Sequence, residues 1–206
     1  MTISLSDAGK RFNRDWIFRH VTYQFEQGKN YAITGSNGSG KSTLLQVLSG
    51  SMHFNEGKCH WHKGGTEIPA ERVYNFISLC APYLDIVEEM NLEEFLAFHH
   101  EFKPFLPGIT PATIIDELGL ERAKHKQIRY YSSGMKQRVK LAQCIFSDTP
   151  VLLLDEPCTN LDTDGIALYH RLINDYGNGR LIIVSSNDET EYRFCEERIS
   201  MASFKK

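Results

Sequence analysis

The chain has 206 residues, with 23 Lys and Arg against 26 Asp and Glu, a formal net charge of −3 and 41% hydrophobic residues. This composition is typical of a globular chain of one domain or slightly more, and it excludes a disordered chain and a globally basic nucleic-acid binder. No apolar run approaches the roughly 18–20 residues that cross a bilayer, and the first residues lack the pattern of a secretory signal.

Residues 2–34 alternate apolar and polar side chains with the two-residue period of strands. The apolar positions of this pattern are Ile3, Leu5, Trp16, Phe18, Val21, Tyr23 and Phe25. A turn at 27–30 precedes a short buried strand at 31–34, and a helix is expected over 42–48 after a glycine-rich segment. Residues 52–79 again favour short strands and turns.

From Pro82 onward, patterns typical of helices replace the strand-like alternation. Asn91, with Glu94 three residues later, predicts an N-cap and a helix to about 102, followed by helices over 112–118 and from 132 or 133 to about 146. A strand at 151–154, a helix at 163–176, a strand at 181–185 and an amphipathic stretch to 199 complete the chain. Strands at both ends with helices inserted at about 82–148 predict an α/β fold.

A glycine-rich segment lies between the strand at 31–34 and the next helix, and it fits the pattern G-x-x-x-x-G-K-[ST]. Glycines let successive N–H groups turn toward an anion, and the helix N-terminus adds a partial positive charge. Lys41 supplies a charge for the β- and γ-phosphates, and Ser42 offers a hydroxyl to Mg²⁺. A chance glycine-rich turn is the alternative. The predicted phosphate-binding residues are Gly35, Ser36, Asn37, Gly38, Ser39, Gly40, Lys41, Ser42 and Thr43.

A second motif joins the all-apolar strand 151–154 to two carboxylates, Asp155 and Glu156. A continuous apolar run predicts a central parallel strand, and ligands bind at the carboxyl ends of such strands. We therefore expect Asp155 to hold Mg²⁺, directly or through water. Glu156 is expected to orient or deprotonate the water that attacks the γ-phosphate. An exposed acidic turn after a core strand is the alternative interpretation.

A third motif, Tyr-Ser-Ser-Gly-Met-Lys-Gln-Arg at 131–138, opens a helix between these two, and Thr-Asn-Leu-Asp follows at 159–162. With these motifs in this order, essentially the whole chain resembles the ATPase subunit of ATP-binding cassette (ABC) transporters. Tyr131 then stands at the Leu of the family signature Leu-Ser-Gly-Gly-Gln. Plain helix capping by a serine here uses the same N–H groups as anion binding. The residues of this signature are Ser132, Ser133, Gly134 and Met135.

The resemblance implies an α/β fold made of a P-loop NTPase core with a mainly parallel sheet, an antiparallel β subdomain and an inserted helical subdomain. The core would take 1–81 and 149–206, and the helical signature subdomain 82–148, within a single ABC ATPase domain. ATP and Mg²⁺ are the implied cofactors. Two such subunits, identical or different, would pair head to tail around two ATP molecules, with Asp162 at the interface. Phe12 would stack on adenine, unless it is only a partly buried strand residue.

The resemblance also implies separate transmembrane permease subunits as partners. We therefore expect a cytoplasmic protein, held peripherally on the cytoplasmic face of the membrane by its permease; five cysteines without a C-x-x-C pair fit a reducing compartment. No nucleic acid is expected, although an ABC ATPase acting on nucleic acid or ribosomes is the alternative. The run 85–121 holds nine carboxylates and only Lys103 as a strong base, which indicates either a solvated surface or docking onto a basic segment.

Two residues of the family pattern are missing. The segment 78–83, Ser-Leu-Cys-Ala-Pro-Tyr, lacks the Gln expected at the entry to the helical subdomain. Asn187 stands where the family has a switch His, and an amide can hydrogen-bond a γ-phosphate oxygen but cannot carry a charge. Because Glu156 is present, we predict ATP hydrolysis at a reduced rate. An ATP-gated binding module with weak hydrolysis is the alternative.

Overall fold

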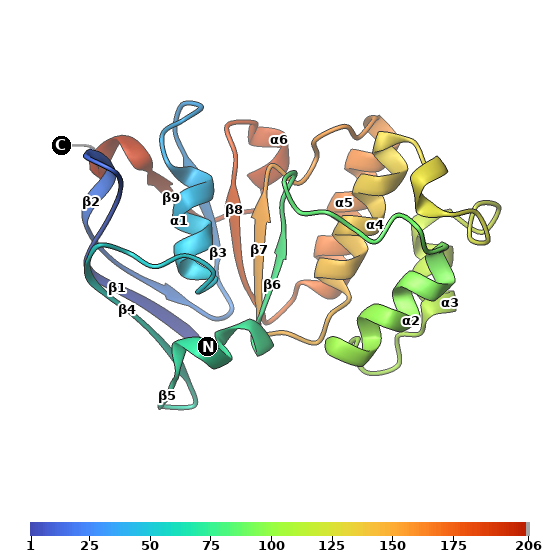
Figure 1. Ribbon diagram of the computed structural model, residues 1–206, viewed down its shortest axis with the longest axis horizontal. Coiled ribbons are helices and arrows are strands. Elements are labelled where there is room, and N and C mark those ends of the chain that lie inside the picture. Colours follow the sequence, from blue (N-terminus) through green and yellow to red (C-terminus); the bar gives the residue numbers. More distant parts are fainter. Residues whose placement is uncertain (205–206) are drawn as a thin grey trace. The chain divides into compact units, whose positions relative to one another are not determined.

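The computed structural model describes residues 1–204, whose contacts divide the chain into two compact units (Figure 1). Unit 1 comprises Met1–Leu79, Thr149–Asp155 and the chain from Gly179 onward. Unit 2 comprises Cys80–Asp148 and Glu156–Asn178. This division differs from the expected one, because 156–178 groups with the inserted helices and not with the core.

Unit 1 contains two sheets, as the α/β prediction requires. The antiparallel sheet has the order β2-β1-β4-β5, with β1 at Thr2–Phe12, β2 at Asp15–Glu26, β4 at Glu56–Lys63 and β5 at Thr66–Ile68. The second sheet has the order β6-β7-β8-β3-β9, with β6 at Ile77–Cys80, β7 at Val151–Asp155, β8 at Leu181–Ser185, β3 at Asn30–Thr34 and β9 at Glu197–Ser200. The pairs β7–β8, β8–β3 and β3–β9 are parallel. The expected fold class is confirmed.

The end of the chain adds detail that the amphipathic pattern did not predict. The stretch to 199 divides into a one-turn helix, α6 at Glu189–Tyr192, and the edge strand β9. Short 3₁₀ segments lie at Ala70–Asn75, Ile128–Tyr130 and Met201–Phe204. Strand β9 pairs with β3 and so extends the parallel sheet by one strand.

The core of unit 1 lies around helix α1, Lys41–Leu48, which is placed between the two sheets (Figure 1). Leu44 and Leu45 of α1 share one buried cluster with Trp61 of the antiparallel sheet and with Leu153 and Ile183 of the parallel sheet. Alternate residues of a strand point to one face, so every second residue of β7 and β8 faces α1. The same face carries Asp155 and Ser185 at the carboxyl ends of these strands.

A buried polar network lies at the amino ends of the parallel strands. The Thr149 hydroxyl lies 2.9 Å from Ser78 Oγ and accepts a hydrogen bond from Arg180 Nη2 at 3.0 Å, while Arg180 Nε donates to the Thr149 carbonyl at 2.7 Å. All three residues are buried. The charged Arg180 can be buried because its guanidinium donates to both the carbonyl and the hydroxyl of Thr149.

Each α-helix of unit 2 begins at a side-chain cap, as local sequence predicts for the first. Asn91 Oδ1 accepts from Glu94 N at 3.0 Å, and Glu94 Oε2 accepts from Asn91 N at 2.9 Å, which completes a capping box. Thr110, Ser132 and Asp162 cap the other three helices. The helices are α2 at Leu92–Phe102, α3 at Pro111–Leu118, α4 at Ser133–Ile145 and α5 at Thr163–Tyr176.

Contacts among these helices explain why α5 belongs to unit 2. The Phe146 and Tyr176 rings meet at 4.7 Å, and the Tyr176 hydroxyl donates to Glu117 Oε1 at 3.0 Å. Arg171 of α5 also pairs with the Glu117 carboxylate of α3. Helix α5 is therefore fixed to both α3 and the end of α4.

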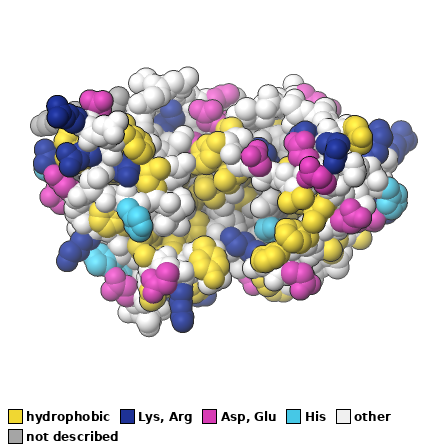
Figure 2. All heavy atoms as spheres, in the orientation of Figure 1, with side chains coloured by type: hydrophobic (Ala, Val, Ile, Leu, Met, Phe, Trp, Pro, Cys, Tyr) yellow, Lys and Arg dark blue, Asp and Glu magenta, His cyan; other side chains and the backbone are white. Residues whose placement is uncertain are grey.

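The acidic run of unit 2 is partly neutralised from within the unit. Lys136 pairs with Glu88 at 2.6 Å and Lys124 with Glu93 at 3.1 Å, so two lysines that follow the acidic run 85–121 in the sequence pair with its carboxylates. Figure 2 shows acidic and basic side chains interspersed over this part of the surface. This arrangement favours the solvated-surface interpretation over docking onto a basic segment.

We predict that Thr149→Val lowers the free energy of unfolding by about 2–3 kcal/mol, because it removes the hydroxyl that the buried Ser78 and Arg180 share. The measurement is urea denaturation. Ser51→Ala, at an exposed serine, is the control. A loss below about 0.5 kcal/mol for Thr149→Val would show that the network does not stabilise unit 1.

Stability is also predicted to fall in mild acid because of His99 on α2. Its ring stacks on Phe95 and Phe105, and Nε2 lies 2.9 Å from Ser147 Oγ. Burial, with Lys103 nearby, lowers the pKa of His99 from 6.5 to about 4. The unfolded chain therefore binds the proton more readily, and stability is lost as the pH falls from about 6.5 toward 4.

We expect the wild type to lose about 1–2 kcal/mol more than His99→Gln between pH 7.5 and pH 5, because glutamine does not titrate. Urea denaturation at the two pH values measures the difference. His53→Gln, at an exposed histidine of unit 1, serves as the control and should behave as the wild type. Equal losses for the wild type and His99→Gln would remove His99 as the cause.

Candidate functional site

The predicted site residues divide between the two units. Phe12, the loop 35–43, Asp155 and Asn187 belong to unit 1. Glu156, the segment 132–135 and Asp162 belong to unit 2. Each set is therefore described within its own unit.

The phosphate loop runs from β3 into α1, as predicted, and its glycines are required by space as well as by backbone angle. Gly35 has φ +147°, and a Cβ there would meet Ser39 Oγ at 2.7 Å. Gly40 has φ +100°, and a Cβ there would meet Ile17 Cγ2 at 2.4 Å. The loop thus passes so close to β2 and to its own turn that side chains at these positions are excluded.

The amino end of α1 provides donors for an anion. Gly40 is the N-cap and supplies no side-chain hydrogen bond, so the first N–H groups of the helix have no side-chain cap. Lys41 is buried, and its Nζ donates to the Gly35 carbonyl at 2.8 Å and lies 3.5 Å from the Ser36 carbonyl. An ammonium group and unsatisfied helix donors together form a cradle for phosphate oxygens.

Asp155 ends β7 and is 2% exposed. Its Oδ1 has no hydrogen-bond partner among residues 1–204. A buried carboxylate oxygen without a donor is costly, and a hard cation or its bound water would satisfy it. The described residues form no cluster of three or more His, Cys, Asp or Glu that could hold a metal. Asp155, Ser42 and nucleotide oxygens fit Mg²⁺, which keeps several waters and needs few protein ligands.

Asn187 follows β8 and is hydrogen-bonded to the phosphate loop. Its Oδ1 accepts from Gly35 N at 3.1 Å, and its Nδ2 donates to Asn37 Oδ1 at 3.1 Å. The structure therefore brings Asn187 and the loop together, as the prediction for the switch position requires. The side-chain amide of Asn187 therefore uses its oxygen and one of its N–H groups in hydrogen bonds to the loop.

Phe12 lies at the turn between β1 and β2 and is 45% exposed. Lys10 Nζ lies 5.1 Å from the centre of its ring and donates to the His53 carbonyl at 2.7 Å. Phe12 is the last residue of β1 and is partly exposed, so both interpretations, base stacking and a partly buried strand residue, stay open. An exposed aromatic face beside a cation is suited to stacking on a heteroaromatic base.

Glu156 is the first residue of 156–178, the second segment of unit 2, and it has an unusual backbone conformation. Its φ is +44°, a left-handed value that non-glycine residues rarely adopt. The conformation is held by Thr159, whose backbone N and Oγ1 both donate to the Glu156 carbonyl, at 3.1 and 2.9 Å. Strained residues held by their surroundings concentrate at functional sites.

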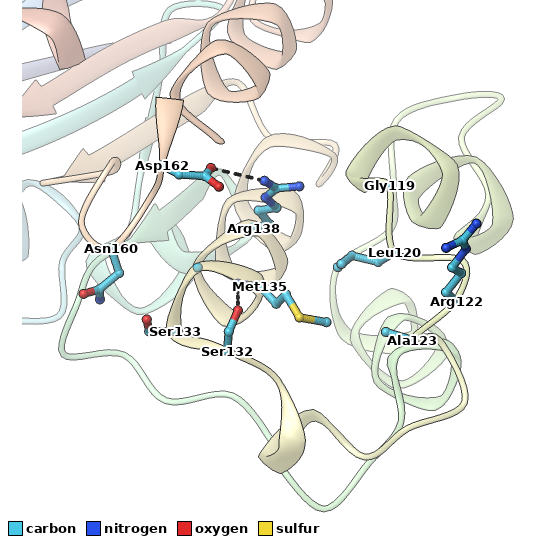
Figure 3. A pocket seen from close by; sticks show the side chains of 11 residues that line it. Gly119, Leu120, Arg122, Ala123, Ser132, Ser133, Met135, Arg138, Asn160 and Asp162 are labelled. Carbon is cyan, nitrogen blue, oxygen red and sulfur yellow. Dashed lines mark hydrogen bonds and ion pairs between the residues drawn. The ribbon is translucent and has the colours of Figure 1, made fainter. Parts of the chain in front are cut away.

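The signature segment begins α4 and opens onto a cavity of about 530 Å³ (Figure 3). Ser132 Oγ accepts from Met135 N at 3.2 Å, so the capping role is real. Gly134 lies so close to the loop before α5 that a Cβ would meet the Asn160 carbonyl at 3.1 Å. Arg122 and Arg138 also line the cavity, which makes it suitable for an anion.

Asp162 has a local role besides the one that the resemblance implies. Its Oδ1 accepts from Gly165 N at 2.8 Å and lies 3.4 Å from Arg138 Nη2 (Figure 3). The Gly165 amide, with Arg138 beside it, lowers the pKa of Asp162. Its side chain is 73% exposed, so it remains available to a partner.

The sequence patterns assigned no role to three residues that shape these sites. Ile17 and Met201 lie against the phosphate-loop glycines, but their apolar side chains carry no motif. Gln137 is buried on α4, and its Nε2 donates to the Pro157 carbonyl at 2.7 Å. It thereby ties the loop after Glu156 to the signature helix. The signal for Gln137 was a polar residue on the buried face of that helix.

A family model and the sequences of known proteins point to the same family. A family model described as "ABC transporter" matches residues 18–159. The "uncharacterized ABC transporter ATP-binding protein YybJ" of Bacillus subtilis is 31% identical over 92% of this chain and 87% of its own length. The "cytochrome c biogenesis ATP-binding export protein CcmA" of Agrobacterium fabrum is 29% identical over 91% of this chain and 89% of its own.

Solved structures share the fold. A putative ABC transporter ATP-binding protein from Pyrococcus furiosus has a TM-score of 0.82 at 20% identity and covers both chains fully. The dimeric bacterial ABC transporter cassette MJ0796 has a TM-score of 0.79 at 19% identity, over 96% of this chain and 93% of that one. Among residues 1–204, no helix is long and apolar enough to cross a membrane. By its family match and its relatives, the chain belongs to the ABC transporter family as an ATP-binding ATPase subunit.

Proposed function

We propose that this chain binds and hydrolyses ATP as a dimer that encloses two Mg·ATP and drives separate membrane subunits. The observation that carries the proposal is the combination, within unit 1, of a phosphate loop with uncapped helix donors, the buried Lys41 and the unpartnered Asp155 oxygen. A triphosphate with its metal satisfies all three features at once. Phe12 would hold the base by stacking, without choosing among bases.

Hydrolysis is assigned to Glu156 and Asn187. The carboxylate of Glu156 would take the proton of the attacking water, and its fixed backbone favours one position for that group. Asn187 would exchange its bond to the loop for a γ-phosphate oxygen, since an amide can donate to an oxyanion. Bound Mg²⁺ would neutralise charge on the phosphates, with Ser42 and Asp155 as its protein ligands.

The signature segment is assigned to the partner's nucleotide. The cavity beside 132–135 carries two arginines and the amino end of α4, which supports phosphate binding. The likeness to a dimeric cassette supports a second ATPase subunit. The exposed Asp162 is then an interface residue that also caps α5.

The relatives support a membrane partner, since one of them is named as an export protein. We assign this chain to the cytoplasmic face of a membrane, held there by a permease. Co-purification with a multi-span membrane protein supports this assignment. Co-purification with ribosomes or DNA would instead favour the alternative, an ABC ATPase acting on nucleic acid.

Glu156→Gln is predicted to lower the ATPase rate by about 10²-fold or more, because a general base contributes roughly 10²–10⁴-fold. ATP binding should persist, so an ATP-loaded dimer should accumulate in size-exclusion chromatography. Glu71→Gln, at an exposed carboxylate of unit 1, is the matched control and should hydrolyse ATP at the wild-type rate. A Glu156→Gln chain that stays monomeric with ATP would contradict the dimer. A wild type without hydrolysis would favour the ATP-gated binding module.

Asn187→Ala is predicted to lower kcat by about 10-fold, the cost of one hydrogen bond to a charged oxygen. Asn187→His should retain activity but acquire a pH dependence centred near 6.5, since imidazole titrates there. Asn174→Ala, at an exposed asparagine of α5, is the control. Steady-state kinetics between pH 6 and 8 makes the measurement. An unchanged kcat for Asn187→Ala would show that this amide has no role in hydrolysis.

A further inference from the structure

A serine that belongs to none of the recognised motifs lies beside Asp155. In the parallel pair β7–β8, Asp155 is in register with Ser185, and Ser185 is in register with Ile33 of β3. Side chains at matched positions of neighbouring parallel strands point to the same face of the sheet. Here that face packs against α1, because the positions two residues earlier, Leu153 and Ile183, belong to the core around that helix.

Both side chains are buried with polar atoms that lack partners. Ser185 is 0% exposed and Asp155 is 2% exposed. Neither Ser185 Oγ nor Asp155 Oδ1 has a hydrogen-bond partner among the described residues, and the same holds for Ser39 Oγ in the phosphate loop. Native proteins rarely leave buried polar atoms unpaired, and each costs about 1–3 kcal/mol. Because Asp155 and Ser185 occupy matched positions of neighbouring strands, their unpaired oxygens indicate a shared polar ligand.

Ser185 differs in this respect from the other buried serines of the parallel sheet and its flanks. Ser78 pairs with Thr149, and Ser186 Oγ accepts from Asp188 N at 2.9 Å. The rest of β8, 181–184, is apolar and almost fully buried. A hydroxyl at the last position of such a strand is destabilising unless something bonds to it.

We propose that Ser185 is a positioning residue for Mg²⁺ and that it holds, together with Asp155, a water of the metal's hydration shell. The inference rests on the proposed function, since it requires Mg·ATP to bind at the phosphate loop. Mg²⁺ keeps several waters when it binds to protein, and outer hydrogen bonds orient such ligands and raise metal affinity. A serine hydroxyl suits this task because its oxygen can accept a hydrogen bond from a metal-bound water.

The test is a Mg²⁺ titration of the full chain at saturating ATP, followed by the melting temperature, together with ATP affinity measured in EDTA. Ser185→Ala should raise the Mg²⁺ midpoint by about 3- to 10-fold, the loss expected for one net hydrogen bond. Its ATP affinity in EDTA should stay within about 2-fold of the wild type. A purely structural role for Ser185 would lower the melting temperature without moving the Mg²⁺ midpoint.

Two further variants complete the test. Ser78→Ala removes an equally buried hydroxyl from the other end of the sheet and should leave the Mg²⁺ midpoint unchanged. Ser185→Cys preserves the size of the side chain with a weak donor, and should raise the midpoint even where Ser185→Ala folds poorly. A midpoint within about 2-fold of the wild type for the folded Ser185 variants, or an equal rise in Ser78→Ala, overturns the proposal. If neither Mg²⁺ nor ATP changes the melting temperature of the wild type, the proposed function itself is overturned.

Discussion

The close approach of the phosphate loop to its surroundings is the constraint on which the site depends. A Cβ at Gly40 would lie 2.4 Å from Ile17, and one at Gly35 would lie 2.7 Å from Ser39. Both glycines also have positive φ, so any other residue would strain the backbone as well as collide. Ile17 of the antiparallel sheet and Met201 lie against these glycines. The core of unit 1 therefore sets the geometry in which phosphate is bound.

In unit 1, the buried polar atoms at one end of the parallel sheet have hydrogen-bond partners, and some of those at the other end do not. At the amino ends of the parallel strands, Thr149 and Arg180 form a closed network. At the carboxyl ends, Asp155 and Ser185 are buried with unpartnered oxygens, and the cation and waters that we propose to bind there would offset the cost of burying them. Stability and function thus occupy opposite ends of one sheet. Asn187, which is bonded to the loop, is a neutral amide, so the bond that we propose it makes to the γ-phosphate would not depend on a histidine proton.

Much of the fold followed from local patterns, because capping residues, apolar runs and glycines act over short distances. Asn91 and Asp162 cap helices where capping was predicted or where the helix was expected to begin, and 151–154 is a buried parallel strand. Long-range packing could not be predicted. The sequence does not show that 156–178 groups with the inserted helices, nor that β9 pairs with β3, because both depend on tertiary contacts.

Affinity for nucleotides of different phosphate number tests the central claim most directly. If the loop and Lys41 grip a triphosphate, calorimetric titration of the wild-type chain with Mg²⁺ should show strong binding of ATP and ADP and little or none of AMP. The reason is that AMP lacks the β- and γ-phosphates to which the ammonium and the helix donors are directed. Equal affinity for all three nucleotides, or no binding of Mg·ATP, would contradict the account.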